Sequence, residues 1–334
     1  MFKEKNPIMT YAARSKDFSL LKVSASGGMF TELAKQIFAK GGVVFGAGWD
    51  TSSMTVAHKC AENMEQLSEM RGSKYAQSSM TGVYSSVRAL LKEGRIVLFT
   101  GMPCQVAAMR KCFGWNPNLV LCGIMCHSMS EPRVWKKYIS ELERKFQSRV
   151  TAVSFRDKRN GWRKSTMVVR FQDSSKDIAE NLYTNVYAKA YFSGYATKQC
   201  CLSCQFRSGR CAADLIIGDF WGVEDHKPEL DDGKGVSAVL LFTDVGRRLF
   251  DLCDIEKYEL TYQQVLAKNP FLETSIKPNL EQRARFWKVY EKMDITGAVK
   301  YAAEGPMWVR VLRFAYRLPR RVVGKSLRIV GLRK

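Results

Sequence analysis

Residues 95–111 read RIVLFTGMPCQVAAMRK. The apolar run Arg95–Phe99 predicts a buried strand, TGMPC predicts a turn, and Gln105–Lys111 predicts a helix. The same order recurs on both sides of this stretch. The further elements are a turn and helix over 24–40, a strand over 42–48, a helix over 81–91, a strand over 119–124 and a helix over 132–146. Alternating strands and helices favour an α/β core from about residue 20 to residue 150.

The remaining sequence continues the mixed pattern. It predicts strands over 150–155 and 165–171, a helix over 181–194, and strands in DLIIGDF and VSAVLLF. From Val245 onward it reads as mostly helical. We therefore expect a two-lobed α/β (mixed α+β) protein in four parts: 1–150, 151–260 with a cysteine-rich loop, a helical extension over 261–304 and a basic tail over 305–334.

Composition bounds the class of protein. With 334 residues, 46% of them hydrophobic, the chain is long enough to bury a sizeable core. It has no apolar run of 18 residues, and its first residues lack the pattern of a signal peptide. We expect a cytoplasmic protein, in which ten cysteines serve metal ligation, redox chemistry or burial more readily than disulfides.

The net charge of +21 indicates an anionic partner. Residues 305–334 hold nine Lys or Arg and no Asp or Glu, and on a helical wheel residues 307–330 separate apolar from basic side chains. A basic amphipathic helix of this kind is typical of segments that lie on an anionic membrane surface. Nucleic-acid binding is a less favoured reading, and a helix packed on the body with its basic face in water is a third.

Cysteines that follow predicted strands form the strongest chemical signal. Cys104 and Cys126 each follow a buried strand, where open α/β sheets place their ligands. Cys201 and Cys204 have the C-x-x-C spacing that presents two thiolates to one metal or cluster. These four thiolates suit a 4Fe-4S cluster or a structural zinc. Incidental, buried cysteines are the remaining reading.

Two glycine-containing segments are candidate phosphate sites. In SASGG, Ser24–Gly28, small hydroxyl residues and glycines precede a helix, whose N–H groups bind phosphate well. Taken alone, this segment favours an ordinary capped helix start over a phosphate site. RGSKY, Arg71–Tyr75, adds two cations and an aromatic ring, which suit a pyrophosphate or a stacked ring but also fit a solvated loop.

Nine segments, taken in order, resemble the beta subunit of the coenzyme F(420) hydrogenase/dehydrogenase family. They are SASGGMFTELA, GGVVFGAGWD, SEMRGSKYAQS, VLFTGMPCQVA, IMCHSMSEPRVWKKYI, VSFRDKRNGW, CLSCQF, IIGDFWGVE and GKGVSAVLL. The resemblance runs from about Thr10 to Phe250. It implies an FrhB-like flavin and iron–sulfur fold that binds FAD and a 4Fe-4S cluster and acts as an oxidoreductase in electron transfer.

The resemblance also implies site residues. The cluster ligands would be Cys104, Cys126, Cys201 and Cys204, with Cys200 or Cys211 as replacements. The cofactor-binding residues would be Ser24, Ser26, Gly27, Gly28, Arg71, Gly72, Ser73, Lys74, Tyr75, Thr100, Gly101, Pro103, Asn160, Trp162, Asp219 and Trp221. Lys74, Tyr75 and Lys158 are the candidates for acid–base roles, although Lys158, Asn160 and Trp162 also suit a purely structural turn.

The chain departs from many family members at its start. It has no cysteine before Cys60, so the N-terminal ferredoxin domain is lacking, and we expect a separate ferredoxin-like electron donor. Similar members occur beside enzymes of polysaccharide synthesis, which favours a small-molecule or sugar-linked substrate in cell-surface polysaccharide assembly over coenzyme F(420) itself. The alternative function is a zinc-stabilised protein that binds a membrane or, less readily, nucleic acid, without redox activity.

Overall fold

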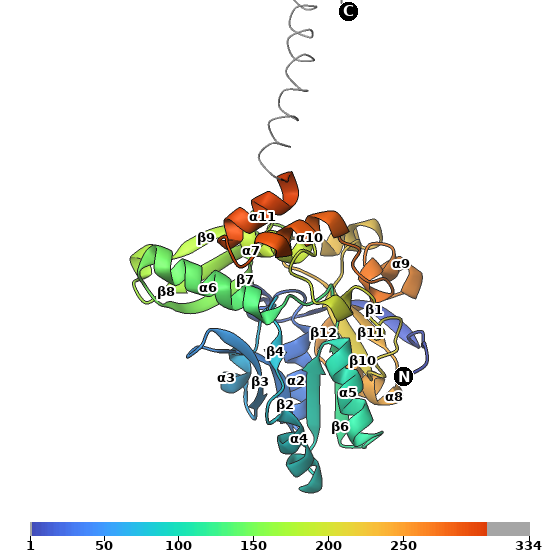
Figure 1. The fold of residues 1–334 in the computed structure, drawn as a ribbon. Coiled ribbons are helices and arrows are strands. Elements are labelled where there is room, and N and C mark those ends of the chain that lie inside the picture. Colours follow the sequence, from blue (N-terminus) through green and yellow to red (C-terminus); the bar gives the residue numbers. More distant parts are fainter. Residues whose placement is uncertain (1, 306–334) are drawn as a thin grey trace, which may run out of the picture.

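Apolar segments build a nine-stranded sheet in the computed structural model, which describes residues 2–305. The strand order is β12-β1-β11-β10-β6-β5-β2-β3-β4 (Figure 1). Strands β2, β5, β6 and β10 run parallel, and β1, β3, β11 and β12 are each antiparallel to a neighbour. The bounds are β1 (Met9–Ser15), β2 (Val43–Asp50), β3 (Thr55–Ala61), β4 (Ser78–Ser79), β5 (Val97–Gly101), β6 (Leu119–Ile124), β10 (Leu215–Asp219), β11 (Ser237–Leu241) and β12 (Ile255–Leu260).

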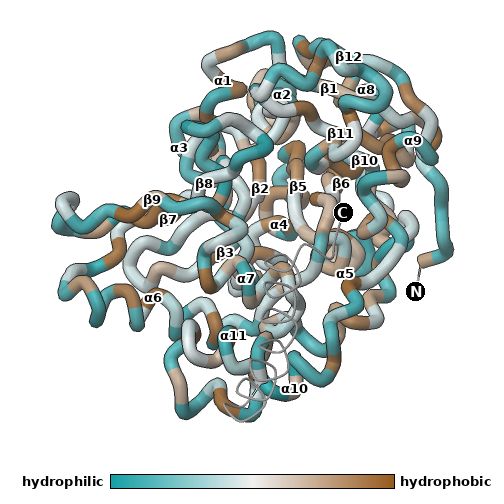
Figure 2. The backbone as a smooth tube through the Cα atoms, turned by 90° about the horizontal axis from the view of Figure 1, so that it is seen from above, coloured by the Kyte–Doolittle hydropathy of each residue, from teal (hydrophilic) through white to brown (hydrophobic). Residues whose placement is uncertain are grey.

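Helices cover both faces of this sheet. Helices α2 (Met29–Phe38) and α8 (Asp244–Asp251) pack on one face, and α4 (Val83–Lys92) and α5 (Pro103–Phe113) pack on the other. The shorter helices are α1 (Phe18–Val23), α3 (Met64–Ser68) and α9 (Tyr262–Leu266). Figure 2 shows hydrophobic residues concentrated along the central strands. These strands are buried on both sides, as parallel strands covered by helices must be.

A smaller lobe lies above the large sheet in Figure 1. It has a three-stranded sheet of β7 (Val150–Asp157), β8 (Thr166–Phe171) and β9 (Ile178–Asn181). Its helices are α6 (Pro132–Phe146), α7 (Val186–Phe192), α10 (Leu280–Val289) and α11 (Ile295–Glu304). The lobe has an aromatic core that includes Trp135, Phe155 and Tyr187. The helices at the end of the described chain thus return to a lobe that began at residue 132, while the four-part division of the chain stays a prediction.

The expected mixed α/β fold is confirmed, with three local corrections. The segment 181–194 is helical only over 186–192, because Asn181 ends strand β9. The region after Val245 contains strand β12, and the sequence reading omitted strands β1 and β3. Strand β12 is an edge strand that pairs with β1, about 245 residues earlier in the sequence. Pairing over such a distance leaves little signal in the local pattern.

The parallel strands place their carboxyl ends at one edge, which faces the small lobe. Chain reversals at this edge carry the TGMPC turn after β5, the MCHS turn after β6 and the DFWG turn after β10. The SASGG turn lies at the same edge, because Ala13 near the end of β1 pairs with Ser237, which in turn pairs with Asp219. Topology therefore gathers the motifs of four distant segments along one edge.

The remaining points concern the predicted tail helix, membrane-spanning helices and the short 3₁₀ helices. The amphipathic helix predicted over 307–330 lies outside the described residues. Among residues 2–305, no helix is long and apolar enough to cross a membrane. Five short 3₁₀ helices complete the described elements: η1 (Ser174–Lys176), η2 (Gln199–Cys201), η3 (Val223–Asp225), η4 (Pro228–Leu230) and η5 (Pro270–Leu272).

Candidate functional site

Five cysteines line one cavity of about 110 Å³ at the carboxyl edge of the large sheet. They are Cys104, Cys126, Cys200, Cys201 and Cys204. Cys104 lies in the first turn of α5, directly after Pro103, which starts the helix. The other wall comes from the loop that begins with η2. Apolar side chains such as Phe206 and Phe271 and the basic side chains of Lys198 and Arg207 complete the lining.

The thiols of this cavity influence one another electrostatically. The pKa of Cys126 is raised to about 12, chiefly by burial; Arg207 lowers it, and Cys104, Cys201 and Cys204 contribute to the rise. Burial, followed by Cys204, also raises the pKa of Cys104. Several thiolates in one buried place repel each other unless a cation lies between them. The donor set therefore suits a positively charged metal group, whose binding would release the thiol protons.

The sulfurs of this cavity are spread around it rather than gathered at one point. Among the described residues, no three His, Cys, Asp or Glu side chains meet closely enough to hold one metal ion. The cysteines surround a cavity instead. A 4Fe-4S cluster needs one thiolate at each of four separate irons. Cys200 shares the cavity with the four predicted ligands, whereas Cys211 is buried and does not line it.

Arg207 fixes the backbone beside the cysteine cavity. Its Nη1 donates to the carbonyl of Cys126 (2.9 Å), and its Nη2 donates to the carbonyl of His127 (2.8 Å). On the loop side, the N–H of Cys204 donates to Oγ of Ser275 (2.9 Å). The sequence reading did not identify Arg207, although its place three residues after Cys204 was the available signal.

A second group of predicted residues meets around Arg156 of β7. Its Nη1 donates to Oδ2 of Asp219, at the end of β10. Its guanidinium lies over the ring of Trp221, 5.4 Å from the centroid, and Trp221 stacks on Trp162 at 4.9 Å with an interplanar angle of 7°. Tyr75 interacts electrostatically with Arg156 and Asp219. RGSKY, FRDKRNGW and GDFW, which are distant in sequence, therefore form one site.

Sequence reasoning missed Arg156, the residue at the centre of this site. It stands in the FRDKRNGW segment, but its type and spacing gave no reason to prefer it over Lys158 or Arg159. Only the packing distinguishes it. Arg159 forms an ion pair with Asp157 and is partly exposed, whereas the side chain of Arg156 is 4% exposed.

The two candidate acid–base lysines hold backbone in place. Nζ of Lys158 donates to the carbonyls of Leu21 and Ser26 (2.8 Å each) and to that of Lys234. Nζ of Lys74 donates to three carbonyls of its own loop, those of Met70, Arg71 and Gly72. Burial lowers the pKa of Lys74 to about 7 and that of Lys158 to about 8.

The serine hydroxyls of the SASGG turn donate hydrogen bonds to backbone carbonyls of the protein. Oγ of Ser24 donates to the Leu20 carbonyl, and Oγ of Ser26 donates to the Val236 carbonyl. Gly28 begins helix α2 in the left-handed conformation (φ 81°), and no side chain caps this helix. Nε of Arg71 donates to Oγ1 of Thr31 in the first turn of α2 (3.3 Å). The helix start and one guanidinium of RGSKY are thus adjacent, as a phosphate site requires.

The other predicted cofactor residues lie in different surroundings. Thr100 is buried and donates to the Phe45 carbonyl, while Gly101 and Pro103 form the turn that leads to Cys104. Gly72 and Ser73 lie in the loop between Arg71 and Lys74. Asn160 donates to Thr166 and lines a separate open cavity of about 370 Å³ with Arg159 and Lys164. The structure therefore does not join Asn160 to the Arg156 group.

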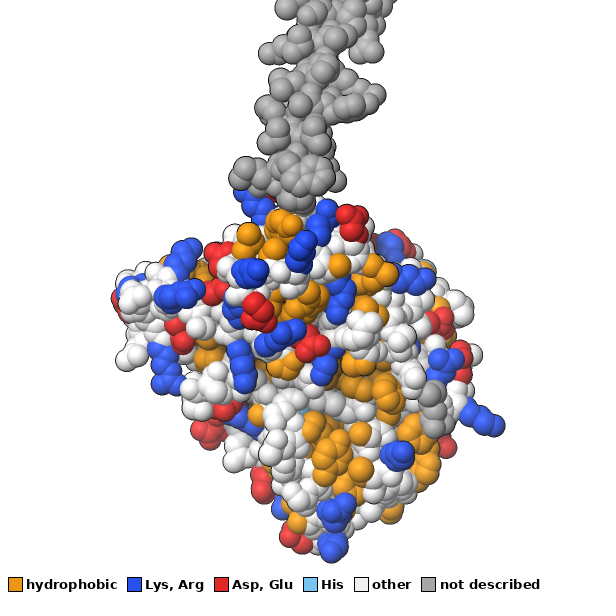
Figure 3. All heavy atoms as spheres, in the orientation of Figure 1, with side chains coloured by type: hydrophobic (Ala, Val, Ile, Leu, Met, Phe, Trp, Pro, Cys, Tyr) orange, Lys and Arg blue, Asp and Glu red, His pale blue; other side chains and the backbone are white. Residues whose placement is uncertain are grey.

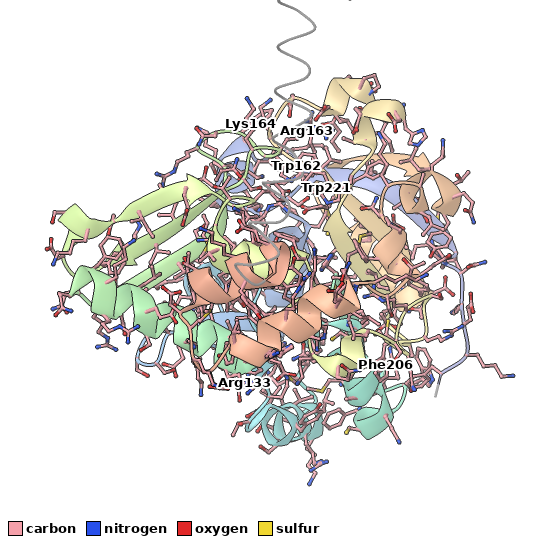
Figure 4. The ribbon with its side chains drawn as sticks, turned by 45° about the horizontal axis from the view of Figure 1, so that its top comes forward. Arg133, Trp162, Arg163, Lys164, Phe206 and Trp221 are labelled. Carbon is pink, nitrogen blue, oxygen red and sulfur yellow. The ribbon has the colours of Figure 1, made fainter. Side chains whose placement is uncertain are left out.

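Aromatic rings connect the Arg156 group to the cysteine cavity. Tyr75 contacts Tyr191 with ring centroids 4.9 Å apart, and Tyr191 contacts His127 at 5.4 Å. His127 follows Cys126 directly in the chain. In Figure 4, Trp162 and Trp221 lie side by side, and Phe206 of the cysteine cavity lies apart from them. Two candidate sites thus share one continuous layer of rings.

Comparisons with known proteins agree with this architecture. The C-terminal family model for the beta subunit of coenzyme F(420) hydrogenase/dehydrogenase matches residues 94–265, and the corresponding N-terminal model matches residues 10–84. No curated protein matches the chain. The structure is similar to a chain of the F(420)-reducing [NiFe] hydrogenase complex from Methanosarcina barkeri, studied by xenon derivatization. The TM-score is 0.53 and the identity 18%, over 80% of this chain and 91% of that one. The chain belongs to the coenzyme F(420) hydrogenase/dehydrogenase beta-subunit family.

Proposed function

We propose that the protein is an electron-transfer oxidoreductase that holds a 4Fe-4S cluster and FAD. The observation that carries this proposal is the cavity lined by five cysteines at the carboxyl edge of β5 and β6. Cys104, Cys126, Cys201 and Cys204 would hold the cluster, with Cys200 as the alternative ligand. When bound, the cluster passes single electrons and the flavin exchanges pairs of electrons with a substrate.

The flavin is proposed to occupy the region between the start of α2 and the Arg156 group. The uncapped helix start and Arg71 suit the pyrophosphate, and the Arg156 group suits the ring system. Lys158 supports this region, because its bond to the Ser26 carbonyl links the RDKRNGW turn to the SASGG turn. Tyr75 has a hydroxyl whose pKa burial raises, so it would stay protonated and able to donate a proton.

We further propose that the electron donor is a separate acidic, ferredoxin-like protein. Residues 94–130 and 181–213, which contribute the cavity cysteines, contain seven Lys or Arg and no Asp or Glu. Cys104 and Cys200 are exposed, so the cluster would lie near the surface. Figure 3 shows hydrophobic side chains gathered over the α4–α5 side of the molecule, with basic side chains around them. Such a surface is complementary to an acidic partner.

The biological setting is proposed from the sequence alone. We propose a reaction on a small-molecule or sugar-linked substrate in cell-surface polysaccharide assembly, on the cytoplasmic side of the membrane. The support is the basic composition of residues 307–330, which suits anionic lipid. Pelleting of the full chain with vesicles of anionic lipid, but not with neutral vesicles, tests this location.

The first test is the content of iron, sulfide and flavin in protein purified without oxygen. We expect visible absorption from both cofactors, and we expect Cys201→Ser to lose iron and sulfide. Cys112→Ser is the matched control, because Cys112 is exposed and does not line the cavity. Colourless wild-type protein that contains zinc would overturn the redox proposal and favour a structural metal site.

A further inference from the structure

Two buried hydrogen-bond donors of Arg156 lack a well-placed acceptor among the described residues. Among residues 2–305, neither its Nε nor its Nη2 makes a hydrogen bond of good geometry, although both atoms are buried and the Tyr75 hydroxyl lies near the guanidinium. A buried donor without an acceptor destabilises the folded protein. This cost is tolerated at Arg156, which is held by the ion pair with Asp219. The arrangement indicates a ligand that completes these bonds.

The geometry of a guanidinium defines what that ligand offers. Nε–H and Nη2–H point in parallel from one edge of the planar group, and this edge is the fork that binds two acceptor atoms at once. Asp219 occupies Nη1 only. Its other oxygen, Oδ1, accepts from Nε1 of Trp162 (3.4 Å), so Asp219 is not free to fill the fork. The unpaired edge therefore suits a planar group with two adjacent acceptors.

The aromatic side chains around Arg156 differ in how deeply they are buried. Trp162 is buried, whereas Tyr75 and Trp221 are each partly exposed and lie against Arg156. A flat ring in the place of the Trp221 side chain would stack on Trp162 and lie against the Arg156 guanidinium. The site thus offers one aromatic face and one bidentate cation.

We propose that the Nε/Nη2 edge of Arg156 binds the N1 and C2=O edge of the flavin ring and stabilises the negative charge of its reduced form. The inference rests on the proposed function. Two electrons, delivered singly by the cluster, and one proton convert the oxidised ring into an anion whose charge lies on N1 and O2. Donors that strengthen as this charge develops raise the reduction potential. Arg156 acts here as a direct contact to the cofactor.

The test compares Arg156→Lys with Arg163→Lys in protein loaded with FAD. Lysine keeps the charge but lacks the fork, and Arg163 lies in the same segment but pairs on the surface with Glu224 and Asp231. The readouts are the midpoint potential of the flavin and its affinity for sulfite, which adds at N5 and places negative charge on the same N1 edge. For Arg156→Lys we expect a lower potential and about ten- to a hundredfold weaker sulfite binding. Arg163→Lys should match wild type.

A second variant should change the flavin potential and the sulfite affinity in the opposite direction. It also tests the inference if Arg156→Lys does not fold. Asp219→Asn removes a negative charge beside the fork while its amide oxygen still accepts from Nη1. We expect a higher flavin potential and tighter sulfite binding. Flavin properties unchanged in the folded variants would overturn the inference and leave the proposed function intact. Wild-type protein that binds no flavin would overturn both.

Discussion

At the scale of single residues, Lys158 joins three segments through one ammonium group. Its three N–H donors match three carbonyls, those of Leu21, Ser26 and Lys234. Burial nevertheless lowers its pKa to about 8, since the charged form loses much of its hydration. This position couples stability to pH in a way that an exposed lysine does not.

We predict a pH-dependent difference between wild type and Lys158→Met. Between about pH 8 and pH 10.4 the unfolded lysine holds its proton and the folded one does not, so the free energy of unfolding rises with pH. Across this pH range, the free energy of unfolding should increase by about 1–2 kcal/mol more in wild type than in Lys158→Met. Urea unfolding at several pH values measures this difference. Lys16→Met, which removes an exposed lysine, should retain the rise. Parallel pH profiles for wild type and Lys158→Met would contradict the prediction.

At the scale of elements, the SASGG turn fits closely between strands. A Cβ on Gly27 would lie 2.5 Å from the Ala13 carbonyl oxygen and 2.7 Å from the Ser237 backbone nitrogen. Both neighbours belong to β1 and β11, so neither moves without disturbing the sheet. The absence of a side chain at this position keeps the turn, and the start of α2 after it, at the carboxyl edge.

Gly27→Ala should therefore displace the turn. We expect a loss of about 1–3 kcal/mol in the free energy of unfolding, together with weaker FAD retention. Gly94→Asn is the matched control, because no atom lies within 4 Å of its Cβ position and Asn tolerates the positive φ of 75°. Urea unfolding and flavin content after gel filtration measure both effects. Full FAD retention in Gly27→Ala would show that the turn does not position the flavin.

At the scale of the whole molecule, the cysteine cavity joins segments that belong to different layers. Cys104 and Cys126 follow strands of the large sheet, and Cys201 and Cys204 lie in a loop that follows α7 of the small lobe. A cluster bound by all four would cross-link the two lobes. Its binding energy would then contribute to the stability of the complete fold.

We predict that cluster removal lowers the thermal unfolding temperature of the whole protein. Treatment with a chelator and an oxidant should lower the midpoint of thermal unfolding by several degrees. Circular dichroism measures the midpoint, and an iron assay measures how much of the cluster has been lost. Cys201→Ser protein should show the lower midpoint without treatment and change little afterwards. An unchanged midpoint after complete iron loss would indicate that the cluster does not join the lobes.

The sequence by itself determined the alternation of strands and helices, the mixed α/β class, the family and the set of cysteines worth testing. These depend on local periodicity and on motif spacing, which are properties of short segments. Tertiary structure decided the rest. It paired β12 with β1, brought Cys200 into the cavity, excluded Asn160 from the Arg156 group and left the fork of Arg156 unpaired within residues 2–305. Such outcomes depend on which distant side chains share one buried volume, and no local pattern records how their hydrogen-bonding capacity is divided.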